Sequence, residues 1–284
     1  MKRFSSLLIF CLIATFVIGQ DKPAYVLYNA KGKKTGFEKM IRLITDKDIV
    51  LFGEFHNNPI AHWLQLEVTT SLKQKRDLVM GAEMFEQDNQ DALDMYLQGK
   101  IKAKGLDSLA RLWKNYPTDY APLVNFAKEN QIAFAASNVP RRYASMVAKG
   151  GFGALDTISA KEKTWIAPLP IAYDPELPGY KKMMEMMGGH SGENLPKAQA
   201  IKDATMAYFI LQYYKPGSLF IHFNGSYHSD NYEGILWHLK NKRPELKYAT
   251  ITTVSQKDVN SLLPENLGRA DFIICVPENM TTTY

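Results

Sequence analysis

Short apolar runs that alternate with helix-forming stretches constrain the fold of this chain more than any other feature. Six such runs have the length of a buried strand, at residues 48–53, 77–83, 131–137, 218–223, 247–254 and 271–276. An alternating strand–helix order predicts an α/β domain with a mostly parallel sheet flanked by helices. With 46% hydrophobic residues in 284, the chain can bury a sizeable core.

The first 19 residues have the pattern of a secretory signal peptide. A basic start is followed by an apolar run at 7–18, and Val17 and Gly19 are small enough for cleavage before the next residue. The apolar run is shorter than the roughly 20 residues that span a bilayer. The residues before Cys11 are large, which argues against a lipid anchor. We therefore expect an exported protein, periplasmic or associated with the outer membrane.

The mature chain is predicted to be one domain, residues 20–284. Its formal net charge falls from +5 to +3 once Lys2 and Arg3 leave with the signal, which is too weak to argue for a nucleic-acid partner. Cys275 is then the single remaining cysteine, so no intrachain disulfide can form, and its apolar surroundings predict a buried strand residue. Because no Cys-x-x-Cys-His motif occurs, any haem would be held non-covalently.

The segment from about 150 to 199 breaks the strand–helix rhythm and predicts a helical insertion over the carboxyl ends of the strands. It contains Tyr180, a methionine group that includes Met183 and Met187, and His190. Methionine forms soft, adaptable apolar surfaces. Two interpretations stay open: a wall that faces a flat hydrophobic ligand, or a helix that packs on the sheet.

Polar side chains follow three of the predicted strands. Glu54 and His56 come after the first run, Glu83 ends the second, and His228 follows the fourth across a short turn. In open parallel sheets, ligands bind beyond the carboxyl ends of the strands. Carboxylates and imidazoles there suit a metal ion, or a general base with its orienting partner. A polar rim held by mutual hydrogen bonds is the other interpretation.

Two further segments are expected at the same edge. Arg141 follows the third strand and begins a predicted helix, where it could pair with an anion. Gln199, Asp203 and Met206 share one face of the helix predicted at 198–214, and an inward polar pair there indicates that this face meets the crevice.

The ordered set of motifs resembles the ChaN-like haem-binding lipoproteins of the Tiki, TraB and erythromycin-esterase-like superfamily. The motifs are Gly53-Glu54-Phe55-His56, Glu83-Met84-Phe85, Trp113 with Tyr116 and Tyr120, Asn138-Val139-Pro140-Arg141, His190, Gln199 with Asp203, and Asn224-Gly225 with His228. The resemblance covers about residues 25–276. It implies an α/β fold with a helical insertion, haem or iron handling outside the cytoplasm, haem pairs between subunits of a homodimer, and an outer-membrane receptor as partner. The missing lipidation motif and the polar Ser226-Tyr227 depart from the family pattern.

Two function classes follow. The first is an exported haem-binding protein in haem or iron acquisition, with Tyr180 or His190 as the iron ligand and Met183 and Met187 against the porphyrin. The second is a metal-dependent hydrolase or protease, in which Glu54 and Glu83 with His56 and His228 hold a divalent metal. In that case Glu54 or Glu83 would be the general base, and Arg141 would stabilise an oxyanion.

Overall fold

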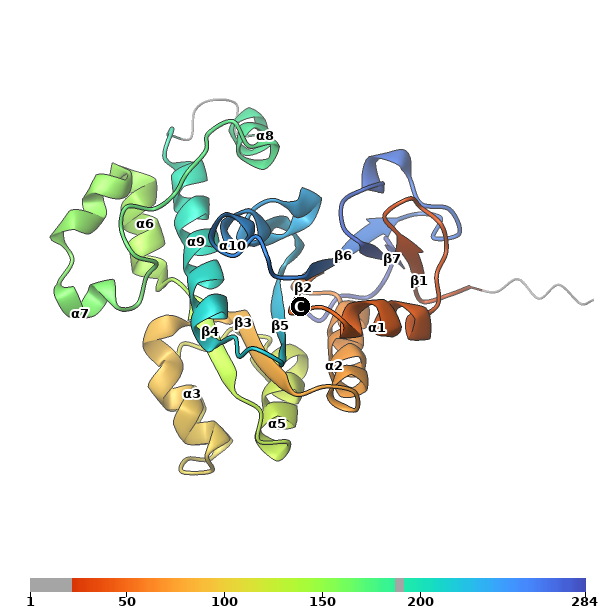
Figure 1. The fold of residues 1–284 in the computed structure, drawn as a ribbon, viewed down its shortest axis with the longest axis horizontal. Coiled ribbons are helices and arrows are strands. Elements are labelled where there is room, and N and C mark those ends of the chain that lie inside the picture. The colour runs from red at the N-terminus through yellow and green to blue at the C-terminus, as the bar shows by residue number, and fades with distance from the viewer. Residues whose placement is uncertain (1–21, 187–191) are drawn as a thin grey trace, which may run out of the picture.

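The computed structural model describes residues 22–186 and 192–284, and its centre is a seven-stranded sheet, which Figure 1 shows between the helices. The strand order is β1-β7-β6-β2-β5-β3-β4. The strands are β1 (Val26–Asn29), β2 (Ile49–Glu54), β3 (Leu78–Glu86), β4 (Phe134–Asn138), β5 (Leu219–Gly225), β6 (Tyr248–Gln256) and β7 (Phe272–Pro277). Only the pairing of β1 with β7 is antiparallel among these strands. The predicted α/β class with a mostly parallel sheet is confirmed.

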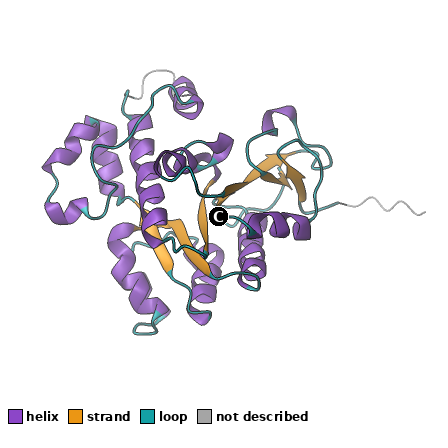
Figure 2. Cartoon of the chain, in the orientation of Figure 1, coloured by secondary structure: helices purple, strands orange, loops and turns teal. Residues whose placement is uncertain are grey.

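Helices cover both faces of the sheet (Figure 2). The side chains of Val50 and Phe52 join the core beneath α1 to α5, whereas those of Ile49 and Leu51 pack against α9 and α10. This alternation follows from the period of two along a strand. The helices are α1 (Phe37–Thr45), α2 (Pro59–Lys73), α3 (Gln90–Leu97), α4 (Ala103–Leu109), α5 (Ala121–Glu129), α6 (Arg141–Gly150), α7 (Ala160–Lys163), α8 (Pro178–Met186), α9 (Leu195–Tyr213) and α10 (Ile235–Lys242).

Short helical turns connect several of these elements. They are η1 (Gln87–Asn89), η2 (Tyr116–Tyr120), η3 (Phe152–Thr157), η4 (Ser226–His228), η5 (Asp230–Tyr232) and η6 (Pro264–Asn266). The turns η4 and η5 follow β5 at the carboxyl edge of the sheet, and η2 precedes α5. These turns therefore contribute residues to the region where the polar side chains gather.

Two local signals explain how the chain leaves the strands. Asn58 caps α2, because its side-chain oxygen accepts a hydrogen bond from the Ala61 amide at 2.9 Å, and Pro59 supplies a preset first helical residue. Pro140 is the N-cap of α6, so that helix begins at Arg141. The two helices thus start within a few residues of the carboxyl ends of strands β2 and β4.

Helix α4 differs from what the sequence pattern favours. The pattern of residues 107–113 favours a helix there, but α4 spans Ala103–Leu109. The amide of Arg111 donates to Asn89 Oδ1 at 2.7 Å, and its guanidinium pairs with Glu86 and Asp88. These contacts hold the chain in a non-helical turn after Leu109.

The described residues of the segment from 150 to 199 contain η3, α7, α8 and the first turn of α9, and no strand. Ile158, Ile166 and Ile171 form an apolar cluster with side chains of α6 and α9. Helix α8 lies beside the first turns of α9, at the top of Figure 1. Met187 and His190 lie outside the described residues. Across residues 22–186 and 192–284, no helix combines the length and apolar character needed to span a membrane.

Candidate functional site at the carboxyl edge of the sheet

Glu54, the last residue of β2, is the centre of a buried hydrogen-bond cluster. Its Oε1 accepts hydrogen bonds from His56 Nδ1 at 2.9 Å and from the Tyr120 hydroxyl at 2.8 Å. Its Oε2 accepts one from the side-chain amide of Gln65. Although the strand ends at Glu54, the chain keeps His56 on the same side, as the spacing of two residues predicted.

A second layer of polar residues holds the backbone of His56. His62 Nε2 and Asn115 Nδ2 both donate to the His56 carbonyl, at 3.0 and 2.9 Å. Asn115 also donates to Asp119 Oδ2 at 2.7 Å, and the hydroxyl of Thr283 donates to the same oxygen at 2.8 Å. The C-terminal segment therefore lies against the β2–α2 turn, near the C mark in Figure 1. Buried, satisfied hydrogen bonds of this kind fix a side chain in one geometry.

His228 is the centre of a second cluster and is only 6% exposed. Its Nε2 lies 3.2 Å from Glu83 Oε1, and its Nδ1 lies 2.5 Å from Asp203 Oδ1. The side-chain amide of Gln199 lies 2.9 Å from the same Nδ1. The face of α9 that carries Gln199 and Asp203 thus meets the crevice. Glu83 is not the end of its strand as expected: β3 continues to Glu86, with a register shift after Ala82.

Electrostatics make His228 a cation between two carboxylates. Burial alone would lower the pKa of His228, but the charges of Glu83 and Asp203 outweigh it and raise that pKa to about 10. Burial would raise the pKa of Glu83, but the His228 charge holds it well below its usual range. Burial raises the pKa of Asp203, and His228 opposes that shift.

His56 differs because its side chain is 35% exposed. Burial lowers the pKa of His56, but the hydrogen bond to Glu54 and the charge of Glu83 outweigh it, and the net shift is upward. Its ring packs edge-on against Trp113, with centroids 4.8 Å apart. With Nδ1 held by Glu54, Nε2 forms no hydrogen bond within the described part of the chain.

Gly225, at the end of β5, brings the two clusters together. Its amide donates to Glu83 Oε2 at 2.7 Å. A Cβ placed there would lie 2.9 Å from His56 Nε2 and 3.4 Å from Glu83 Oε2. The absence of a side chain therefore lets the His56 ring approach the strand. The structure thus brings Glu54, His56, Glu83 and His228 to one region.

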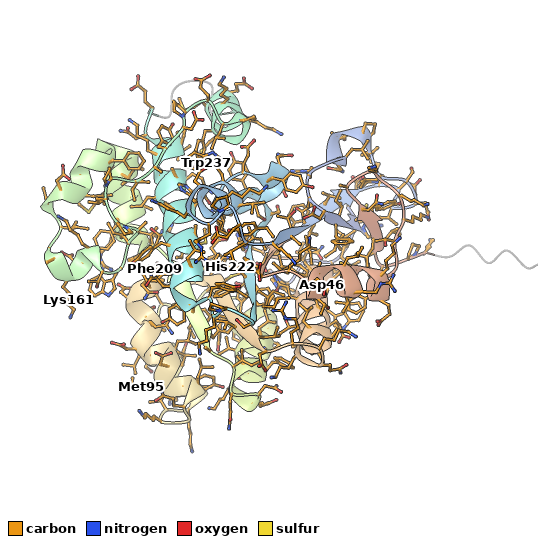
Figure 3. The ribbon with its side chains drawn as sticks, in the orientation of Figure 1. Asp46, Met95, Lys161, Phe209, His222 and Trp237 are labelled. Carbon is orange, nitrogen blue, oxygen red and sulfur yellow. The ribbon has the colours of Figure 1, made fainter. Side chains whose placement is uncertain are left out.

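A polar chain runs from β4 to the turn below Gly225. His222, labelled near the centre of Figure 3, is fully buried between Ser137 Oγ at 2.7 Å and Asn224 Oδ1 at 3.1 Å. The Asn224 amide donates to the Gly225 carbonyl at 2.9 Å and to Ser229 Oγ at 3.0 Å. Burial lowers the pKa of His222 to about 4, so it is neutral near pH 7. These residues support the site without reaching its surface.

The backbone of residues 231–234 passes close to His228 in an unusual conformation. Asn231 and Tyr232 have φ angles of +58° and +63°, and Gly234 has +55°. A Cβ on Gly234 would lie 2.3 Å from the His228 carbonyl oxygen, so only glycine fits. Non-glycine residues in this region are uncommon and are often found at functional sites.

The expected metal set does not form. Among the described residues, no group of three or more His, Cys, Asp or Glu side chains could hold a metal ion. Glu83 and Asp203 are paired with His228, and Glu54 accepts from three neighbours. The four expected metal ligands therefore lie close together, but they bind one another: His56 contacts Glu54, and His228 contacts Glu83.

Arg141 does not join the crevice cluster. It is the first residue of α6 and is exposed, with no hydrogen bond or ion pair to another described residue. Its neighbour Arg142 pairs with Asp88 at 2.7 Å. Within residues 22–186 and 192–284, nothing connects Arg141 to an oxyanion position.

Tyr180, the third residue of α8, lies next to the His228 cluster. It is 5% exposed, and its hydroxyl is buried without a hydrogen-bond partner in the described chain. It lines a cavity of about 250 Å³ with Asp203, Tyr227 and Lys182. Burial and the charge of Asp203 raise the pKa of Tyr180 far above its usual value. An orphaned buried hydroxyl of this kind calls for an explanation.

The beginning of α8 is docked onto the turn that carries His228. The Tyr227 hydroxyl donates to the Gly179 carbonyl at 2.7 Å, and the Gly179 amide donates to Glu233 Oε2 at 2.7 Å. Met183 is half-buried on the same helix. Lys181, the residue after Tyr180, pairs with Glu176 at 2.5 Å.

Sequence reasoning missed the residues that surround Glu54 from other segments. Gln65 and His62 lie on α2, three residues apart, and both are buried on its inner face. Polar residues at helical spacing on an otherwise apolar face were the available signal. Asp119 had no such signal, because its role depends on the docking of η2.

Comparison with known proteins identifies the family. The family model described as "Haem-binding uptake, Tiki superfamily, ChaN" matches residues 40–239, and the chain belongs to this family. No curated protein matches the sequence.

Solved structures support the same fold. The structure of Campylobacter jejuni ChaN with cofacial haem is similar, with a TM-score of 0.66 at 19% identity over 88% of this chain and 96% of that one. The RRSP effector domain of a Vibrio vulnificus MARTX toxin gives a TM-score of 0.49 at 15% identity over 87% of this chain and 40% of that one. The first likeness establishes the fold, and the second is too low to carry an argument.

Proposed function

We propose that this protein is exported and binds haem in haem or iron acquisition. Membership of the ChaN haem-binding family, over residues 40–239, is the observation that carries this proposal. The signal pattern of residues 1–19 supports export, to the periplasm or the outer membrane. Intact mass of protein from the native host tests the export step: a mature chain that begins at Gln20 supports it, and one that retains Met1 contradicts it.

Tyr180 is the described residue best suited to hold haem iron. A tyrosine oxygen is an established ligand of haem iron, and the bound haem would supply a ferric centre at that oxygen. The Tyr180 hydroxyl is buried beside a cavity and has no hydrogen-bond partner within the described chain. Lys182, on the rim of that cavity, is exposed and can pair with a propionate. His190 is the second candidate, outside the described residues.

The Glu54 and His228 clusters are unsuited to the propionates. Glu54 and Glu83 accept no hydrogen bond from a Lys or Arg among the described residues, whereas the α8 cavity, although Asp203 also lines it, has Lys182 and Arg269 in its lining. A negatively charged propionate placed among these carboxylates would be repelled. We therefore assign haem to the side of α8 and not to the crevice.

The size of the cavity supports a second subunit. At about 250 Å³ it is smaller than the roughly 300–1,000 Å³ of ordinary ligand pockets, so it would enclose only part of a porphyrin. The Campylobacter jejuni structure is described as binding haem cofacially. A homodimer with a haem pair between subunits is thus our proposal, and an outer-membrane receptor is the proposed partner for transfer.

Hemin titration tests the haem site. Phe should replace Tyr180, with Tyr173→Phe as the matched control, because the two rings lie 5.4 Å apart and Tyr173 does not line the cavity. We expect Tyr180→Phe to weaken binding at least tenfold and to change the visible spectrum, and Tyr173→Phe to do neither. Unchanged binding in Tyr180→Phe, with loss in His190→Ala, would reassign the ligand. Sedimentation velocity with and without hemin measures the oligomeric state, and we expect a dimer when hemin is bound.

A second function is favoured by the Glu54–His56 pair. His56 Nδ1 is fixed by Glu54 at 2.9 Å, which leaves Nε2 able to accept a proton from water. We infer that the crevice can support hydrolysis with His56 as general base. The described His, Asp and Glu side chains of the crevice are not arranged to hold a metal ion, so we assign no metal to this reaction. Turnover of chromogenic esters that persists in His56→Gln would exclude this role.

A further inference from the structure

An apolar cavity on the outer side of α9 and α10 is separate from the crevice. Its volume is about 390 Å³, within the range of small-molecule sites. Ala204, Ala207 and Leu211 of α9 form one wall, and residues 167–172 form another. Asp203 and Met206, on other faces of the same helix, contact His228 and the sheet core. The helix thus separates this cavity from the Glu83 cluster.

His238 of α10 lines the cavity, and no hydrogen bond explains its burial. It is 6% exposed, its Nε2 is buried without a partner, and its ring forms no hydrogen bond in the described chain. Burial and the nearby Lys242 lower the pKa of His238 to about 4, so the ring is neutral near pH 7. Polar side chains so deeply buried normally have hydrogen-bond partners. A polar group of a bound ligand beside the His238 ring would explain why the protein provides none.

The charged residues of the cavity are all cationic. Lys242 and Arg243 line it, and its lining includes no Asp or Glu. Arg243 is paired with Glu245, whereas Lys242 is exposed and forms no ion pair with another described residue. A ligand that complements this site has an apolar body for the alanine and proline walls and an anionic group for Lys242.

We propose that this cavity binds a small carboxylate with an apolar chain, at a site separate from that of haem. The chain lies against Ala204 and Ala207, and the carboxylate pairs with Lys242. A neutral alcohol of the same length lacks the ion pair and binds more weakly. This inference does not depend on the haem proposal, because the two cavities share no lining residue.

Calorimetric titration with decanoate and decanol tests the proposal on the purified full chain. We expect saturable decanoate binding, with decanol at least tenfold weaker. Lys242→Gln should weaken decanoate about tenfold and leave decanol unchanged, and Lys242→Arg should restore it. The matched control is Lys240→Gln, on the same helix but outside this cavity. No saturable binding, or equal effects of Lys240→Gln and Lys242→Gln, would overturn the proposal.

Two further measurements locate the ligand. Trp237, labelled in Figure 3, packs edge-on against His238 with centroids 4.7 Å apart, so its fluorescence should change on binding and the change should vanish in Trp237→Phe. Ala172→Trp, at an exposed position of the lining, should block both decanoate and decanol. If hemin competes with decanoate, the site is part of the haem surface and the claim of a separate site fails.

Discussion

His56 and His228 lie at the same edge of the sheet, and both contact a carboxylate, yet their surroundings differ. His228 is buried between Glu83 and Asp203, so both of its ring nitrogens are occupied. His56 is one-third exposed and is held by Glu54 through one nitrogen only. The difference shows that a conspicuous His–carboxylate pair can hold the fold together or remain available for chemistry, and that burial and the second nitrogen decide which.

Removal of His228 should have the largest effect. In His228→Ala, two buried carboxylates lose the cation between them, and breaking a buried ion pair in this way costs about 3–5 kcal/mol. We expect the free energy of unfolding, measured with urea, to fall by that amount. Asp203→Asn, which keeps the shape of the partner, should cost less. A loss below about 1 kcal/mol for His228→Ala would mean that the cluster does not stabilise the fold.

The pH dependence of stability should identify the same residue. The pKa of His228 is raised from 6.5 to about 10 in the folded protein. Its contribution to stability is therefore fully present below about pH 6.5 and is lost as the pH rises through about 10. Urea unfolding at intervals from pH 6 to 9.5 should show a decline for the wild type and a flatter profile for His228→Gln. Parallel profiles would contradict the assignment of His228 as the buried cation.

Removal of His56 should cost much less stability. In His56→Ala, Glu54 keeps its hydrogen bonds from Tyr120 and Gln65, and the lost contact is screened by solvent. We expect a loss of about 1 kcal/mol or less in the same urea experiment. A loss equal to that of His228→Ala would show that both histidines are structural, and the contrast between them would disappear.

The fold could be predicted from the sequence to the extent that strands were apolar on both faces. All six predicted runs are strands, because burial on two sides leaves a continuous apolar pattern. Strand β1 gave no such signal: it has four residues, two of them partly exposed, and it pairs antiparallel with distant β7. Helices α1 and α10 were likewise not among the predicted elements.

The position of the site could be predicted from the sequence, but the hydrogen-bond and ion-pair partners of its side chains could not. Glu54, Glu83 and His228 follow apolar strands, and the parallel topology brings their ends together. Sequence patterns do not encode which acceptor each imidazole takes, and in the described residues the predicted metal ligands form hydrogen bonds and ion pairs with one another, so the structure does not support the metal set. The orphaned hydroxyl of Tyr180 depends on how α8 docks on residues 227–233, which no local pattern specifies.

The smallest expected effect on stability tests how the two clusters meet. In Gly225→Ala, the new Cβ would lie 2.8 Å from His56 Cε1 and 2.9 Å from Nε2, so a side chain must move. Gly225 is buried, but His56 is partly exposed and its ring can shift outward, so we expect a stability loss of less than about 1 kcal/mol, no larger than that of His56→Ala. Gly53→Ala is the matched contrast: its Cβ would lie 2.9 Å from the Ser226 backbone, which cannot move as easily, so Gly53→Ala should cost more stability.

NMR titration of the His56 ring should show a changed pKa in Gly225→Ala, since a displaced ring loses its hydrogen bond to Glu54. An unchanged ring in that variant would mean that Gly225 does not position His56 and that the two clusters act independently.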